Sequence, residues 1–203
     1  LKTLTMNDVS FEFETDFYAY DSITVNNLKN SSLAELIYKG AKIQRYDEYA
    51  ELETMEISNL KFNSPSTYIS EFNYMEHPRE LFLFFDSLAS FKFENFYQEV
   101  YERNGLSYIA TVDSSEISNF KTKQINGLSI PVSFDHTTSG ITITSNDQVV
   151  KDYFDRLGYD ELKFDYSTNF KWSPSSEIFT FNFNIGMQEG AEILFKTKFD
   201  DID

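Results

Sequence analysis

The sequence contains no cysteine, and several other residues that mark particular functions are scarce. Without cysteine it has no disulfide framework, no thiolate nucleophile and no cysteine-ligated zinc site. The seven glycines never cluster into a phosphate-binding loop, which disfavours nucleotide enzymes. Lys and Arg total 17 against 33 Asp and Glu, and a net charge of −16 disfavours nucleic acid as a partner.

Long hydrophobic runs are missing as well. No run approaches the roughly 20 apolar residues that a membrane-spanning helix needs, so we expect no transmembrane segment in this chain. No signal peptide is present, but the chain starts at Leu1 rather than Met. We therefore expect residues 1–203 to form a single domain, either a mature, trimmed protein or a fragment of a longer one.

Aromatic residues, in contrast, are plentiful. They make up 17% of the chain, with 21 Phe and 13 Tyr against one Trp, and 41% of all residues are hydrophobic. Aromatic and β-branched side chains fit the half-buried surface of a pleated sheet. The composition therefore predicts a β-rich domain with a hydrophobic core.

Two segments predict helices. The first spans residues 78–103, after His77-Pro78 and before Asn104-Gly105, and the second spans residues 147–157, capped by Asn146 or Asp147 and ended by Gly158. Apolar residues recur in the first segment at spacings of three and four, which is typical of one face of a helix: Leu81, Phe84, Phe85, Leu88 and Phe91.

Elsewhere, alternation of polar and apolar residues predicts strands. Residues 11–69 indicate several strands with irregular joints, with residues 31–37 either helical or extended. Residues 106–144 indicate a hairpin that turns at 135–140 (DHTTSG). The clearest alternation predicts a three-stranded antiparallel meander in the C-terminal region, over residues 162–172, 179–187 and 191–199.

The predicted fold class is therefore α+β: a mainly antiparallel sheet whose aromatic face is covered by the two helices. Burying one Phe side chain stabilises a fold by roughly 1.5 to 3 kcal/mol. A sheet with so many aromatic side chains is thus expected to be covered.

A short pattern recurs three times: TVNNLKN at 24–30, EISNLKFN at 56–63 and EISNFKTK at 116–123. Each copy has an apolar residue two positions before an Asn, then an apolar residue and Lys. The three asparagines are Asn27, Asn59 and Asn119. A unit of roughly 30 residues repeated along a sheet would explain the pattern, and chance in a chain rich in Asn, Lys and Phe is an equal alternative.

The polar residues form no motif that indicates a particular reaction. His77 and His136 belong to no HExxH or His-x-His motif, and no G-x-S-x-G marks a nucleophilic serine. Asp200, Asp201 and Asp203 are expected to form a solvated acidic tail. The sequence thus predicts no catalytic, cofactor-binding or metal-binding residue, and we expect a protein that is not an enzyme. A hydrolase that uses carboxylates ranks third, behind the two hypotheses given at the end of this section.

Residues 157–199 read LGYDELKFDYSTNFKWSPSSEIFTFNFNIGMQEGAEILFKTKF. A helix end followed by three amphipathic strands resembles modules of β-rich bacterial envelope proteins, of the AsmA-like or related uncharacterised periplasmic families. The resemblance implies a place in the bacterial periplasm or cell envelope, with the cytoplasm as the alternative. It also implies the use of an apolar sheet face for lipid handling or envelope maintenance.

Two functional hypotheses follow. The first is a non-enzymatic binding or assembly module of the envelope that contacts partner proteins through sheet edges or acidic faces. The second is a carrier of a hydrophobic ligand such as a lipid, held between the aromatic sheet face and a helix. The residues expected to contact such a ligand are Phe164, Tyr166, Phe179, Phe181, Phe183, Phe195, Phe84, Phe85 and Leu88.

Overall fold

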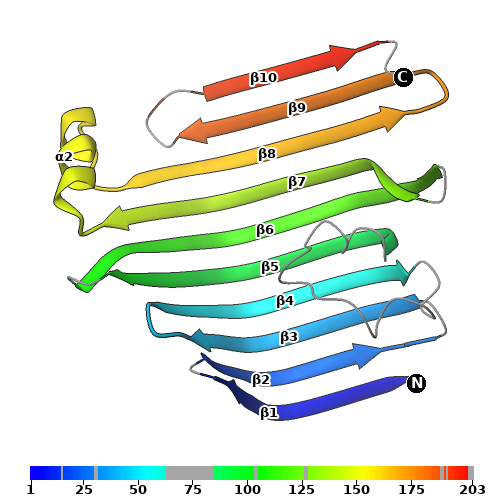
Figure 1. The fold of residues 1–203 in the computed structure, drawn as a ribbon, viewed down its shortest axis with the longest axis horizontal. Coiled ribbons are helices and arrows are strands. Elements are labelled where there is room, and N and C mark those ends of the chain that lie inside the picture. Colours follow the sequence, from blue (N-terminus) through cyan, green and yellow to red (C-terminus); the bar gives the residue numbers. More distant parts are fainter. Residues whose placement is uncertain are drawn as a thin grey trace.

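The computed structural model is one antiparallel sheet of ten strands, in which each strand pairs with its neighbours in sequence (Figure 1). It describes residues 1–14, 16–29, 32–62, 85–102, 105–125, 128–187, 190 and 192–200. One helix, α2 (Gln148–Leu157), is present in that part of the chain. The strands are β1 (Thr3–Phe13), β2 (Asp16–Asn26), β3 (Ser32–Gln44), β4 (Glu48–Phe62), β5 (Phe85–Glu102), β6 (Gly105–Ile125), β7 (Leu128–Ser145), β8 (Leu162–Ser173), β9 (Ile178–Met187) and β10 (Glu192–Phe199).

The predicted α+β fold with a helix-covered face is wrong. Residues 85–102 of the first predicted helix form strand β5, and residues 78–84 lie outside the described part of the chain. The second predicted helix is confirmed as α2, but it does not cover the sheet. It stands at the ends of β7 and β8 (Figure 1), and none of its residues is buried.

Helix α2 has the predicted caps. The Asp147 side chain accepts hydrogen bonds from the amides of Val149 and Val150 at 2.8 and 3.1 Å. Gly158 ends the helix with φ of 80°, a left-handed conformation that glycine adopts without a steric penalty. These local signals explain why a helix forms here although none of its residues is buried.

Three strand predictions can be compared with the sheet. The C-terminal meander is confirmed as β8, β9 and β10. Residues 32–37, which left helix and strand open, belong to β3. The hairpin turn expected at 135–140 is wrong, because these residues continue through β7 and the chain only bends there.

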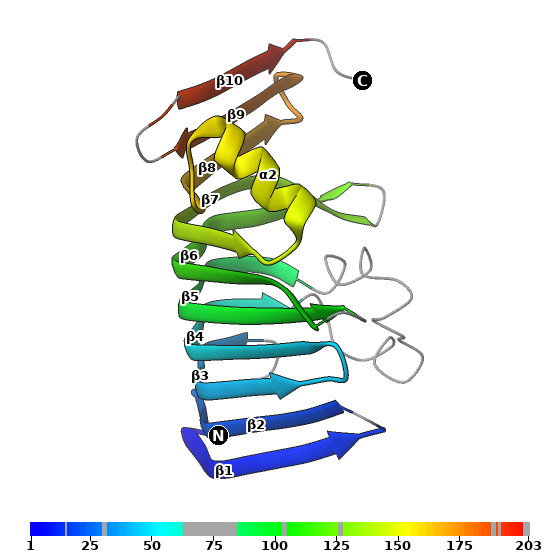
Figure 2. The same cartoon turned by 90° about the vertical axis from the view of Figure 1, so that its left-hand side faces the viewer.

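Two lines of bends cross the sheet and fold it into a trough, and Figure 2 shows the bent strands stacked along its length. Along the first bend line, alternate strands carry a residue with a left-handed backbone, φ between 51° and 64°, and the intervening strands carry an acid. The left-handed residues of this line are Asp8, Gly40, Asn95 and Gly140, and the acids are Asp21, Glu53, Asp113 and Asp165.

The second bend line contains the three asparagines of the repeated sequence pattern. Asn27, Asn59 and Asn119 have φ of 52°, 50° and 54°, and the register places Ala34 and Ala89 on the strands between them. The pattern is therefore a structural repeat that marks one bend at each of β2, β4 and β6. Asparagine suits this place because its short polar side chain tolerates the left-handed region.

Close packing explains why the first bend line combines glycine with aspartate. A Cβ atom on Gly40 would lie 2.0 Å from a carboxylate oxygen of Asp21, and one on Gly140 would lie 2.0 Å from a carboxylate oxygen of Asp113. The Gly140 amide also donates a hydrogen bond of 2.7 Å to the carboxylate of Asp165. The acids therefore occupy the space that the missing side chains leave.

Each bend also changes the spacing of the apolar residues. The rings of Phe93 and Phe96 lie on the same side of the sheet, 6.1 Å apart, although three positions separate them in sequence. Between them, Asn95 takes the left-handed conformation and is exposed. The three-residue spacing that predicted a helix over 78–103 is thus the signature of a bent strand.

We call the side of the sheet toward which these apolar residues point the inner face. All described residues that are buried lie on it, and the bend residues beside them are mostly exposed. They are Leu33, Ala41, Ala50, Leu60, Phe120 and Ile141, with the polar Ser115 and Thr138.

Candidate functional site: the inner face of the trough

Between the two bend lines the inner face carries two rows of side chains, one residue from every strand. Partners in an antiparallel register project to the same face, so the rows follow from the pairing of the strands. The first inner row is Met6, Ile23, Tyr38, Met55, Phe93, Ser115, Thr138, Tyr166, Ile185 and Ile193; the second is Leu4, Val25, Leu36, Ile57, Phe91, Ile117, His136, Thr168, Phe183 and Phe195.

Further apolar residues flank these rows beyond each bend. Tyr20 and Tyr38 pack with ring centroids 5.4 Å apart across the first bend line. Leu33 and Leu60, just beyond the second bend line, are both 6% exposed. The inner face therefore continues from the floor of the trough onto both walls.

The trough is longer than it is wide. Ten strands about 4.8 Å apart span roughly 43 Å along the trough. In β3, Ala34 and Gly40 mark the two bends, and six residues of strand correspond to about 20 Å of floor. This elongated shape suits a chain-like ligand that lies across the strands.

The residues predicted from sequence to contact a hydrophobic ligand mostly meet on this face. Phe164, Tyr166, Phe179, Phe181 and Phe183 lie on β8 and β9, where Phe170 and Phe179 make an edge-to-face contact at 5.3 Å.

The other predicted ligand residues have different positions. Phe195 is on β10, opposite Phe183, and Leu88 is opposite the buried Phe120. Phe84 lies outside the described residues, and Phe85 opens β5 in a segment whose side chains are not described.

In the described part of the chain, no helix or second sheet lies over the inner face. All ten strands belong to one sheet, and α2 stands at its border. No large side chain among the described residues is fully buried. The predicted bracket of aromatic sheet and helix is thus replaced by a trough of one layer.

A polar cluster interrupts the apolar rows on β6, β7 and β8. The Ser115 hydroxyl lies 3.0 Å from His136 Nε2 and 2.9 Å from the Thr138 hydroxyl. The Tyr166 hydroxyl lies 3.1 and 3.2 Å from the two nitrogens of the same imidazole. Burial lowers the pKa of His136, which favours the neutral form of the ring.

This cluster lacks the carboxylate that would orient the imidazole of a catalytic triad. Asp135, the neighbour of His136 in sequence, projects to the opposite face, where its carboxylate accepts hydrogen bonds from Asn119 and Asn169. The sequence did not reveal the cluster, because residues 135–140 were interpreted as a turn. Tyr166 and Phe170 show which residues of β8 point to the inner face. Because β7 pairs with β8, the same alternation would have placed His136 on the inner face as well.

The outer face is charged. Lys92 lies between Glu56 and Glu116 in the register and forms an ion pair of 2.5 Å with Glu94. The hydrogen bond and charge of Lys92 hold the pKa of Glu94 below its usual value. Charged side chains at these positions identify the outer face as the side turned to water.

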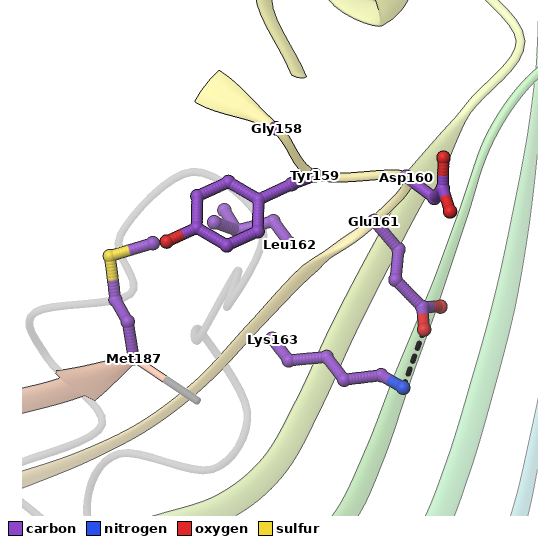
Figure 3. A pocket seen from close by; sticks show the side chains of 7 residues that line it. All are labelled: Gly158, Tyr159, Asp160, Glu161, Leu162, Lys163 and Met187. Atoms are coloured by element: carbon purple, nitrogen blue, oxygen red, sulfur yellow. Dashed lines mark ion pairs between the residues drawn. The ribbon is translucent and has the colours of Figure 1, made fainter. Parts of the chain in front are cut away.

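A shallow hollow lies where the chain leaves α2 and enters β8 (Figure 3). Its lining includes Tyr159, whose ring extends toward Met187, and an ion pair of 2.5 Å between Glu161 and Lys163. The described residues contain no group of three or more His, Asp or Glu side chains placed to hold a metal ion. The hollow is small compared with the trough and holds no cluster of reactive groups.

Comparison with models of known protein families, with characterised proteins and with solved structures finds no match for this chain. Among the described residues, no helix is long and apolar enough to cross a membrane.

Proposed function

We propose that the inner face binds a long hydrophobic chain, such as the acyl chain of a lipid, and that the protein acts by binding rather than by catalysis. The observation that carries the proposal is the pair of inner rows. They run the length of the sheet, are apolar over most of it, and face a space that no described element fills.

An ordinary hydrophobic core would account for the same residues only if a second layer covered them. In the described chain, side chains such as Leu36, Ile57 and Phe91 are only half-buried in one layer of sheet. Exposed apolar surface of this extent is uncommon on soluble proteins that have no apolar partner. A ligand lying in the trough would supply the missing layer.

The energetics favour such a ligand. Each methylene group removed from water contributes about 0.8 kcal/mol when it is fully buried. In an open trough about half of that is gained, so a 16-carbon chain can gain roughly 6 kcal/mol before the cost of immobilising it. This is sufficient for weak, reversible binding, which suits a carrier.

We propose the bacterial envelope as the compartment, because residues 157–199 resemble modules of envelope proteins. Contact with a partner protein through the sheet edges is the second candidate function. It is favoured by the exposure of apolar side chains on β1 and β10, such as Phe13 at 66% and Phe195 at 54%.

Titration with cis-parinaric acid, a fatty acid whose fluorescence rises in an apolar environment, tests the proposal. Ile57 points to the inner face, and its neighbour Ser58 points to the outer face. We expect Ile57→Gln to weaken binding about tenfold, because a chain over this residue would desolvate an amide at a cost of about 1 to 2 kcal/mol.

Ser58→Gln is the matched control, since it places the same side chain one residue away on the opposite face. It should bind the probe like the unchanged protein. Absence of saturable binding, or equal losses in the two variants, would show that the inner face is not the binding surface.

A further inference from the structure

We propose that strand β10 of one molecule pairs with strand β1 of a second copy, so that the sheet and its trough continue from chain to chain. This interaction surface does not depend on what the trough binds. It follows from the two strands of the sheet that have an unpaired side, β1 and β10.

Exposed apolar side chains concentrate on these two strands. On β1, Phe11 and Phe13 are 49% and 66% exposed, and on β10, Ile193 and Phe195 are 55% and 54% exposed. In the described parts of the eight inner strands, only Phe17 and Tyr101 are exposed large hydrophobic residues, at 37% and 39%. The edges therefore offer apolar surface that the inner strands have already covered with their neighbours.

The direction of the strands fits the pairing. Nine antiparallel steps lead from β1 to β10, so these two strands run in opposite directions. A copy shifted along the sheet therefore presents its β10 antiparallel to β1. No two-fold rotation of the copy is required, and the meander continues with the same alternation.

The inner rows set the register, because a slip of one residue would turn Ile193 and Phe195 to the outer face. The first bend line reaches β10 at Glu192, which the register connects to Asp165 through Gly186. When the rows are joined, Glu192 of the second copy lies opposite Asn7, one residue from the left-handed Asp8. β7 and β8 accommodate an offset of this kind by a register shift between Thr138 and Ile141, so the bend can continue through the junction.

The pairs that this register forms belong to both inner rows. Ile193 of the second copy comes to lie opposite Met6, and Phe195 opposite Leu4, which are the members of the same rows at the other edge. The apolar floor thus passes from one molecule to the next without a break. Pairing would cover four side chains that are each at least 40% exposed.

Charge distinguishes this pairing from the symmetric ones. The β1 segment Thr3–Phe13 contains the acids Asp8 and Glu12 and no basic residue, whereas β10 contains Lys196 and Lys198 with Glu192 as its only acid. Two β1 edges would bring like charges together, and so would two β10 edges. The β1 edge also has neither lysine nor proline, the usual protections of an edge strand.

Cysteine cross-linking tests the register against a clean background, since the chain has no cysteine. Lys2 accepts a backbone hydrogen bond from Asn27, so by alternation the amide of Leu4 also faces β2. Leu4 and Phe195 of the second copy would then form a non-hydrogen-bonded pair with Cα atoms about 4.5 Å apart, within the range of a disulfide.

We expect a mixture of the Leu4→Cys and Phe195→Cys proteins to form a mixed disulfide dimer under mild oxidation. The Leu4→Cys and Phe199→Cys mixture, which is out of register by four residues, should form little. A dominant Leu4→Cys homodimer would show symmetric β1 pairing and overturn the proposal, as would equal cross-linking in both mixtures or none in either.

Association of the unmodified chain gives an independent measurement. By the same alternation the Thr5 amide faces the open edge, so Thr5→Pro removes a donor needed for pairing but no bond to β2. Light scattering should show a mass that rises with concentration for the unmodified chain and for Thr5→Ala, and a monomer for Thr5→Pro. A constant monomer mass for the unmodified chain would contradict the proposal.

Discussion

Three glycine-to-alanine substitutions separate the two physical requirements of the bend lines, the left-handed backbone and the close approach of a carboxylate. Gly140 has φ of 64°, and a Cβ there would meet the Asp113 carboxylate at 2.0 Å. Gly158 has φ of 80° but nothing within 4 Å of its added Cβ. Gly186 has neither a left-handed backbone nor a close neighbour.

The expected changes in the free energy of unfolding follow from these differences. Gly158→Ala should cost about 1 kcal/mol, the penalty for a left-handed residue with a Cβ. Gly140→Ala should cost about 2 to 3 kcal/mol, because the Asp113 side chain must also move away. Gly186→Ala should be neutral or stabilising by up to about 1 kcal/mol, since alanine restricts the unfolded chain.

Urea denaturation followed by circular dichroism measures all three variants against the unchanged protein. The midpoint should fall most for Gly140→Ala, less for Gly158→Ala and not at all for Gly186→Ala. Equal midpoints for Gly140→Ala and Gly186→Ala would refute the packing of glycine against aspartate as the origin of the first bend line.

Three further predictions concern the second bend line, an ionisable contact and the trough. Asn59→Ala should destabilise the fold by about 1 kcal/mol while Asn59→Gly should be nearly neutral, since only the alanine resists φ of 50°, and urea midpoints compare the two. A hydrogen bond that Tyr97 donates to Glu99 raises the pKa of Tyr97 to about 12. The contact therefore stabilises the fold below pH 10, and this stabilisation is lost as the pH rises through 12. An absorbance titration should show a lower pKa for Tyr97 in the Glu99→Gln variant. Displacement of cis-parinaric acid should show a 16-carbon fatty acid binding about 15-fold more tightly than a 12-carbon one, since four half-buried methylene groups add roughly 1.6 kcal/mol, and equal affinities would argue against a chain lying in the trough.

Much of the strand pattern could be predicted from the sequence, because alternation is a local property. The meander formed by β8, β9 and β10 follows directly from the parity of residues such as Phe179, Phe181 and Phe183. The capped helix α2 was equally local, fixed by Asp147 and Gly158. The predictions succeeded where neighbouring residues alone determine the backbone.

The bends explain why the other structural predictions were wrong. A residue such as Asn95 with left-handed backbone shifts the parity of a strand, and the resulting three-residue spacing of Phe93 and Phe96 is also the spacing of a helix. The same shift at Gly140 made residues 135–140 look like a turn and hid the position of His136 on the inner face. The repeated Asn pattern held the needed information, but only the pairing of distant strands shows that its copies lie on one line.

The central claim is that the inner face of the trough holds a hydrophobic chain. Photolabelling with a fatty acid that carries a diazirine on its acyl chain, followed by mass spectrometry of the peptides, tests it most directly. The account predicts labels on inner-face residues such as Leu36, Ile57 and Phe91, removed by an excess of unlabelled fatty acid. Labels on outer-face residues such as Glu56 and Lys92, or labelling that the competitor does not reduce, would contradict it.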